Sequence, residues 1–213
     1  MHHRVLVRSP NYPLILERLK SGNENFLDLG CCFGQELRKL IADGAHSENL
    51  YGSDLRPEFF DLGYKLFRDK ESLNSTFIAA DIFDESSALS SLDGNIDIIY
   101  AGSFLHLFGY EEQIKVCKRI VKLLRDKEGS LLLGRQVGDV VAGETVHNTN
   151  KSLNMFRHNS ESFKKMWEEV GEATGTKWRV ESEMMVPEGS YIKERGEAHG
   201  PSVRCIRFSV FRE

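Results

Sequence analysis

One nine-residue segment, FLDLGCCFG at positions 26–34, constrains the fold of this chain more than any other stretch. Its first four residues are apolar apart from Asp28, as in a short buried strand, and Gly30 and Gly34 predict a tight turn that leads into a helix. Because glycine has no side chain, the backbone of such a turn can lie close to a bound molecule. We therefore expect a nucleotide-type pocket here, contacted by Asp28, Gly30, Cys31, Cys32 and Gly34.

The spacing of the glycines separates two kinds of nucleotide pocket. A dinucleotide-binding turn carries further glycines at the third and sixth positions counted from Gly30, and these positions hold Cys32 and Gln35. A pyrophosphate-binding turn is therefore disfavoured. The spacing instead resembles motif I of the class I S-adenosylmethionine-dependent methyltransferases, which implies S-adenosyl-L-methionine as the cofactor.

Length and charge limit the organisation and the partners of the chain. The chain has 213 residues, 40% of them hydrophobic, which is enough to bury one good core and too few for two ordinary domains. We therefore expect residues 1–213 to form a single domain. The formal charge of −4 and the lack of a run of Lys and Arg disfavour nucleic acid as a partner. We expect a small-molecule acceptor substrate instead, and we leave a homodimer open.

Cysteines and apolar segments bear on metal binding and on location. The four cysteines, at positions 31, 32, 117 and 205, match neither a disulfide framework nor a zinc-ligand spacing, so no metal is expected. No segment approaches the roughly 20 apolar residues that cross a bilayer, and the first residues lack a signal-peptide pattern. These observations predict a cytoplasmic protein that does not bind membranes.

Strand-like and helix-like periods alternate along most of the chain. Strands are expected at 26–29, 49–53, 76–80, 96–101 and 130–134, and helices at 12–20, 36–42, 57–67, 111–125 and 160–173. The alternating segments 178–186 and 203–211 predict a closing antiparallel pair. This order predicts an α/β, Rossmann-like class I methyltransferase fold: a mostly parallel seven-stranded sheet with helices on both faces and an antiparallel closing strand. Residues 138–158 are expected to form a loop over the pocket.

Polar residues follow several of the expected strands. Because ligands of open α/β sheets bind at the carboxyl ends of the strands, four side chains are expected to meet in one crevice: those of Asp28, Asp54, Asp81 and Ser103. Asp54 lies 24 positions after Gly30, where a carboxylate can accept both hydroxyls of a ribose. The alternative is that Asp54 caps the helix that begins near Pro57.

The remaining cofactor contacts are expected around these strand ends. Asp81 can accept from the exocyclic amine of an adenine while Ile82 forms an apolar wall, and the alternative for Asp81 is an ordinary loop acid. Leu55 and Ala101 complete the predicted cofactor contacts. Cys32 stands where many motif I sequences have glycine, so its side chain is expected to face the methionine portion of the cofactor as a small hydrophobe, without thiol chemistry.

Longer segments resemble one group within this superfamily. The stretches FLDLGCCFGQELRKLIADGA, ENLYGSDL, TFIAADIFD, IDIIYAGSFLHLF, LLLGRQVGD and FRHNSESFKKMWEEVGEATGTKW are similar to fungal meroterpenoid-pathway O-methyltransferases of secondary metabolism, from about Tyr12 to Trp178. The resemblance implies methyl transfer to the carboxyl or hydroxyl group of a small terpenoid or polyketide. Members of this group carry a further helical segment before Tyr12, so residues 1–25 are expected to be a shortened N-terminal segment and helix.

Three residues are candidates for work on the acceptor. His106, just beyond the fourth strand, can act as a base toward a hydroxyl acceptor, and the alternative is a packing residue among its apolar neighbours. Arg157 can clamp a substrate carboxylate through its two-donor fork, with His158 beside it. The alternative for Arg157 is support for the start of the helix at Ser160.

Two other functions stay open at the level of sequence. The chain could use the methyltransferase fold and bind the cofactor while catalysing a different step on a polyketide, such as a cyclisation, because a fold does not dictate its chemistry. It could also be an inactive, truncated binding protein. Release of S-adenosylhomocysteine with candidate acceptors would separate methyl transfer from both alternatives.

Overall fold

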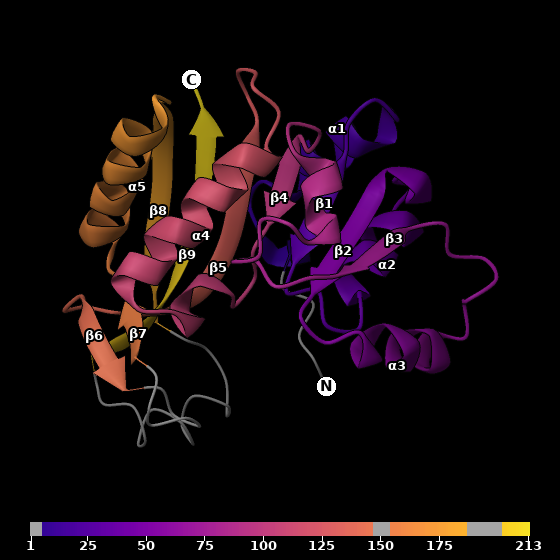
Figure 1. Ribbon diagram of the computed structural model, residues 1–213, viewed down its shortest axis with the longest axis horizontal. Coiled ribbons are helices and arrows are strands. Elements are labelled where there is room, and N and C mark those ends of the chain that lie inside the picture. Colours follow the sequence, from indigo (N-terminus) through magenta and orange to yellow (C-terminus); the bar gives the residue numbers. More distant parts are fainter. Residues whose placement is uncertain (1–5, 147–153, 187–201) are drawn as a thin grey trace.

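A sheet of seven strands runs through the centre of the protein (Figure 1). The structure is a computed structural model that describes residues 6–146, 154–186 and 202–213. The strand order is β3-β2-β1-β4-β5-β9-β8. The strands are β1 (Phe26–Leu29), β2 (Leu50–Asp54), β3 (Thr76–Ala79), β4 (Ile98–Tyr100), β5 (Leu131–Asp139), β8 (Trp178–Met185) and β9 (Val203–Arg212). The first five are parallel and β9 is antiparallel to β5 and β8, which confirms the predicted sheet.

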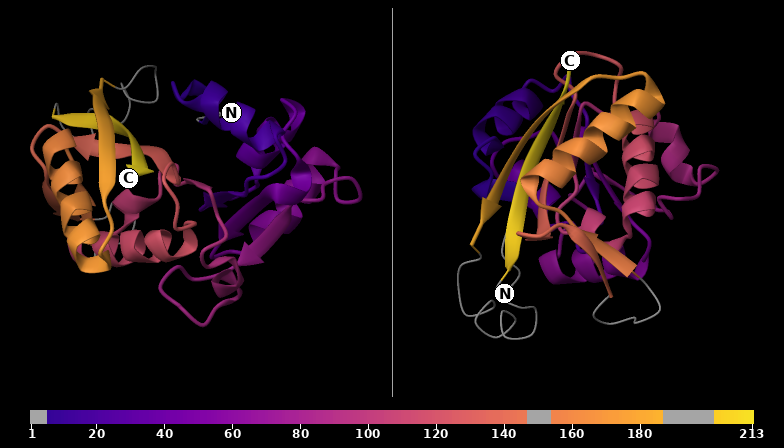
Figure 2. Two further views of the ribbon diagram at one scale, coloured as in Figure 1. Left: turned by 90° about the horizontal axis from the view of Figure 1, so that it is seen from above. Right: turned by 90° about the vertical axis from the view of Figure 1, so that its left-hand side faces the viewer.

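Helices lie on both faces of this sheet (Figure 2). They are α1 (Tyr12–Lys20), α2 (Gln35–Ala42), α3 (Glu58–Phe67), α4 (Tyr110–Leu123) and α5 (Ser160–Thr174). α1 and α2 pack on one face and α4 and α5 on the other. α3 is mostly exposed, and its Phe60 packs against the hydrophobic core on the same face as α1 and α2.

The alternation of side chains along β1 accounts for the two layers. Phe26 belongs to the core that includes Leu40 of α2, and the next residue, Leu27, belongs to the core that includes Ile120 of α4 and Trp167 of α5. Successive side chains of a strand point to opposite faces, so a strand that is covered on both sides needs apolar residues at nearly every position. Asp28 breaks this rule, and it lies on the α2 side of the sheet.

The strand predicted at 130–134 is too short. β5 continues to Asp139, because each of its residues from Leu131 onward pairs with a residue of β9. The partner strand comes from the end of the chain, and its pairing extends β5 through Gly134 and Gly138, which are poor strand formers on their own. The longer strand brings Arg135 and Gln136 to the carboxyl edge of the sheet.

The loop expected at 138–158 is corrected by the structure. Two short strands, β6 (Gly143–Val146) and β7 (Asn154–Arg157), form a separate antiparallel pair within it. Residues 147–153, between them, lie outside the described residues, as do residues 187–201 between β8 and β9 and residues 1–5 of the expected N-terminal segment. Each of the two strands is only four residues long, so the sequence shows too few alternations to reveal them.

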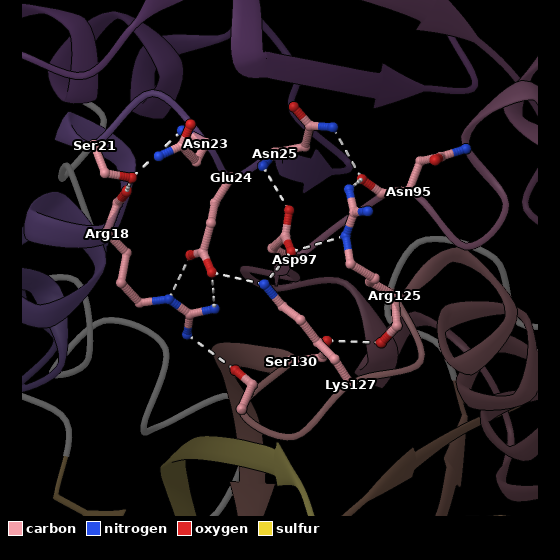
Figure 3. Close-up of polar contacts among 11 residues, drawn as sticks. Arg18, Ser21, Asn23, Glu24, Asn25, Asn95, Asp97, Arg125, Lys127 and Ser130 are labelled. Atoms are coloured by element: carbon pink, nitrogen blue, oxygen red, sulfur yellow. Dashed lines mark hydrogen bonds and ion pairs between the residues drawn. The ribbon is translucent and has the colours of Figure 1, made fainter.

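A network of charged side chains closes the opposite, amino-terminal edge of the sheet (Figure 3). Asp97, just before β4, is fully buried. Its carboxylate accepts from the backbone N–H of Asn25 at 2.8 Å, from Nε of Arg125 at 3.0 Å and from Nζ of Lys127 at 2.7 Å. Lys127 also binds Glu24, which lies beside a cavity of about 520 Å³. This network joins the starts of β1, β4 and β5.

Candidate cofactor site

The turn after β1 has the backbone that its glycines predict. Gly30 and Gly34 have φ angles of 72° and 68°, and Cys32 between them has a φ of 52°. The N–H groups of Gly30 and Cys31 donate to the carbonyl of Ser53 at 2.8 Å and 3.1 Å, which ties the turn to the end of β2. A Cβ added at Gly30 would lie 2.8 Å from the ring of Phe104, so this position excludes side chains on two grounds.

Asp54 connects the end of β2 to the same turn. One of its oxygens accepts from the N–H of Cys32 at 2.9 Å, and the other accepts from the N–H of Arg56 at 3.1 Å. No side chain caps the start of α3, so Asp54 does not act as the cap of this helix. Each carboxylate oxygen can accept a second hydrogen bond, which leaves capacity for two ribose hydroxyls.

The predicted adenine contacts lie at the ends of β2 and β3. Asp81 is exposed and accepts from the N–H of Phe83 at 2.9 Å, a bond that a loop acid makes without any ligand. Ile82 is buried, whereas Leu55 is 64% exposed next to Asp54. Ala80 donates to the carbonyl of Asp54 at 3.0 Å, so these strand ends lie side by side. The adenine role of Asp81 and Ile82 remains a prediction.

Beyond the end of β4 lies another non-glycine residue with left-handed backbone. Ser103 has a φ of 56°, and its N–H donates to the carbonyl of Arg135 at 2.6 Å. Its side chain is exposed, while Ala101, two residues earlier, is fully buried, and the predicted cofactor contact of Ala101 remains a prediction. Strained residues of this kind gather at ligand sites, where the surrounding fold holds them in place.

Asp28 is buried on β1 and has an oxygen without a hydrogen-bond partner. Its Oδ2 is inaccessible to solvent, and the side chain pairs in register with Tyr100 of β4. Burial, with the nearby carboxylates of Glu36 and Asp54, raises the pKa of Asp28 well above its ordinary value. A cationic ligand group beside Asp28 would lower this pKa again, since an adjacent positive charge favours the carboxylate form. The amino group of a methionine moiety fits this requirement.

The two adjacent cysteines have different surroundings. Cys31 is buried in the core beside α2, and its predicted cofactor contact remains a prediction. Cys32 is partly exposed at the turn. Burial raises the pKa of both thiols above their ordinary value, which keeps them protonated and unreactive at neutral pH.

His106 lies on a 3₁₀ turn, Leu105–Leu107, beyond the end of β4. Its backbone N–H donates to the side-chain carbonyl of Gln136 at 3.2 Å, and Gln136 on β5 is almost fully buried. Sequence reasoning missed Gln136, although a polar residue within a buried strand is itself a signal of a specific role. The turn also presents aromatic rings: Phe108 lies 5.5 Å from Phe104 and 5.2 Å from Phe83 between centroids.

The structure gives His158 a supporting role at the start of α5. Its ring is fully buried, 4.7 Å from that of Phe156 and 5.4 Å from that of Phe163, and its Nδ1 lies 2.8 Å from the hydroxyl of Ser162. Burial lowers the pKa of His158 to about 4. These contacts favour a packing role for His158, and its predicted substrate contact remains a prediction.

Arg157 is also buried and lies at the end of β7. Its Nη1 is 3.8 Å from a carboxylate oxygen of Asp139, the last residue of β5. This pair links the small β6–β7 sheet to the main sheet. The arrangement favours the supporting alternative for Arg157, and its role as a carboxylate clamp remains a prediction.

The described residues, 6–146, 154–186 and 202–213, carry no candidate metal site and no candidate membrane-spanning helix. Within them no group of three or more His, Cys, Asp or Glu side chains could hold a metal ion. Within the same ranges no helix combines the length and the apolar character that crossing a membrane requires.

Comparison with known proteins identifies what this arrangement is similar to. Residues 26–127 match a family model described as a methyltransferase domain. The O-methyltransferase phiE of a fungal species is 53% identical over 172 residues, which cover 80% of this chain and 57% of phiE. The O-methyltransferase atr3 of Stereocaulon alpinum is 45% identical over 205 residues, covering 96% of this chain and 58% of atr3. The chain thus spans less than two thirds of the length of these relatives.

Solved structures share the fold at low sequence identity. A Burkholderia thailandensis 1,6-didemethyltoxoflavin N1-methyltransferase, solved with bound 1,6-didemethyltoxoflavin and S-adenosylhomocysteine, has a TM-score of 0.61 and 15% identity. The match covers 99% of this chain and 79% of that protein.

Proposed function

We propose that this chain, which carries a methyltransferase domain of the class I S-adenosylmethionine-dependent family, transfers a methyl group to an oxygen of a small molecule. The single observation that carries this proposal is the joined strand-end site: the Gly30–Gly34 turn bonded to Asp54, with the unsatisfied carboxyl of Asp28 beside it. The names of phiE and atr3 as O-methyltransferases support oxygen as the methylated atom.

The cofactor is S-adenosylmethionine, which supplies an activated methyl group on a sulfonium when it is bound. Asp54 binds the ribose hydroxyls, Asp81 and Ile82 hold the adenine, and Asp28 accepts from the amino group. Because the donor is already activated, the protein mainly has to align the acceptor and exclude water. The backbone of Ser103 and the Phe104 ring close the side of the crevice next to β4.

The acceptor we propose is a terpenoid or polyketide acid or phenol of fungal secondary metabolism. The sequence resemblance to fungal O-methyltransferases of secondary metabolism supports this class, as do the neighbouring rings of Phe83, Phe108 and Phe104 beyond the ends of β3 and β4. Rings of this kind offer a large apolar surface to a hydrophobic acceptor. For a hydroxyl acceptor His106 serves as the base, and a carboxylate acceptor needs none because it is ionised at neutral pH.

The test is a methyl-transfer assay that compares the parent protein with a variant expected to bind the cofactor more weakly. The protein is incubated with S-adenosylmethionine and a panel of phenols and carboxylic acids, and S-adenosylhomocysteine and product masses are measured. We expect one acceptor class to gain a single methyl group on oxygen, and Asp54→Ala to reduce this gain when the cofactor concentration is limiting. Binding of the cofactor without transfer to any acceptor, or a product methylated on carbon or nitrogen, would contradict the proposal.

A further inference from the structure

Three polar side chains lie on one face of the sheet at the carboxyl ends of adjacent strands. Asp28 on β1 pairs in register with Tyr100 on β4, and Tyr100 pairs with Leu133 on β5. Arg135 is two residues beyond Leu133, so its side chain leaves the same face of the sheet about 7 Å further toward the carboxyl edge. The longer β5 that β9 stabilises is what places Arg135 there.

These side chains lack the partners that buried polar groups normally have. Oδ2 of Asp28, the hydroxyl of Tyr100 and Nε of Arg135 are all buried without a hydrogen-bond partner. Within the described part of the chain, Arg135 forms no ion pair with a carboxylate. Its register partner on β9, Arg207, binds Glu183 at 2.6 Å. Buried polar groups left unpaired are costly, so this set indicates a ligand.

The charges in this set are separated along the crevice. Asp28, Glu36 and Asp54 act on one another at the β1 end, and burial and the acids together raise the pKa of Tyr100. Arg135 is the cation that opposes this rise from the β5 side. A ligand that suits both ends carries a cationic group for the acids and an anionic group for the guanidinium. An amino-acid zwitterion has this pattern.

We propose that Arg135 binds the α-carboxylate of the methionine portion of S-adenosylmethionine, while Asp28 accepts from its α-amino group. The guanidinium fork matches a carboxylate with two parallel hydrogen bonds, which a lysine cannot reproduce. A carboxylate could also come from the acceptor, but an acceptor acid without an amino group offers no cation to the acids at the other end of the set. The cofactor is therefore the occupant that fits both ends.

Calorimetry with two ligands tests this assignment without catalysis. S-adenosylhomocysteine and its decarboxylated analogue are titrated into the unsubstituted protein, Arg135→Gln, Arg135→Lys and Arg207→Gln. We expect Arg135→Gln to weaken S-adenosylhomocysteine at least tenfold and to change the decarboxylated analogue by less than about twofold. Arg135→Lys should lose an intermediate amount, and the matched control Arg207→Gln should bind both ligands as the parent does.

A substitution at Asp28 tests the other end of the same site, and two results with Arg135→Gln would overturn the proposal. Asp28→Asn should weaken both ligands, because both keep the amino group, and thermal unfolding checks that each variant is folded. An equal loss of both ligands in Arg135→Gln would overturn the proposal, since Arg135 would then act on the shape of the site. Unchanged binding of S-adenosylhomocysteine would overturn it too and leave Arg135 free for an acceptor carboxylate. The inference rests on the cofactor alone, so binding without methyl transfer would overturn only the proposed function.

Discussion

At the scale of single residues, Asp54 holds the turn after β1 and is the predicted ribose ligand, and one substitution removes both interactions. Asp54 accepts from the N–H of Cys32 and thereby holds the turn after β1, and its remaining lone pairs are the predicted acceptors for the ribose hydroxyls. Hydrogen bonds to a charged group contribute about 1.5 to 3 kcal/mol each, so Asp54→Ala should weaken cofactor binding at least tenfold. Calorimetry measures this, with Glu58→Ala on α3 as a control. Equal affinities for parent and Asp54→Ala would remove Asp54 from the site.

His106 is the residue whose role depends on the acceptor. If the acceptor is a phenol, His106→Ala should lower turnover by roughly a hundredfold, with little change in cofactor affinity. Raising the pH toward about 10 should partly rescue the variant, because the phenol then ionises on its own. With a carboxylate acceptor the loss should be modest at every pH. Turnover across pH decides this, and a variant as fast as the parent with both acceptors would leave His106 as a packing residue.

At the scale of elements, α5 depends on the neutral ring of His158 at its start. The pKa of this ring is lowered to about 4 in the folded protein, against 6.5 when it is exposed. Between these pH values the unfolded chain binds the extra proton and the folded chain does not, so stability is full above pH 6.5 and falls as the pH drops toward 4. The loss should reach about 3 kcal/mol. His158→Gln should flatten this part of the curve in urea unfolding, and an unchanged slope would contradict the lowered pKa.

Helices and strands could be predicted from the sequence where their bounds depend on neighbouring residues alone. The helix at 12–20 has the bounds of α1, and the helix at 57–67 begins one residue before α3, because apolar spacing and Pro13 and Pro57 mark their starts. The full length of β5 and the β6–β7 pair depend on hydrogen bonds to distant strands. The site divides in the same way: the turn and Asp54 follow from spacing, whereas Arg135 and Gln136 need the length of β5, and the burial of His158 needs the packing of α5.

At the scale of the whole molecule, binding and stability are divided between the two edges of the sheet. The carboxyl edge holds strained and unsatisfied groups, including Ser103 and Asp28, which weaken the fold where a ligand is expected. The amino edge is closed by the Asp97 network, in which the buried carboxylate has three donors (Figure 3). Substitution at the amino edge should therefore change stability without changing cofactor affinity.

Asp97→Ala tests this division. Removing one partner of a buried charged group costs about 3 to 5 kcal/mol, and the lower end applies here because Arg125 and Lys127 are 40% and 38% exposed and can be solvated. Glu85→Ala is the matched control: it removes an ion pair with Lys122 in which both side chains are at least half exposed, and such pairs contribute at most about 1 kcal/mol. Urea unfolding measures the free energy and calorimetry the cofactor affinity. A loss below about 1 kcal/mol for Asp97→Ala would contradict the stabilising role of this network, and weakened cofactor binding in a folded variant would show that the two edges do not act independently.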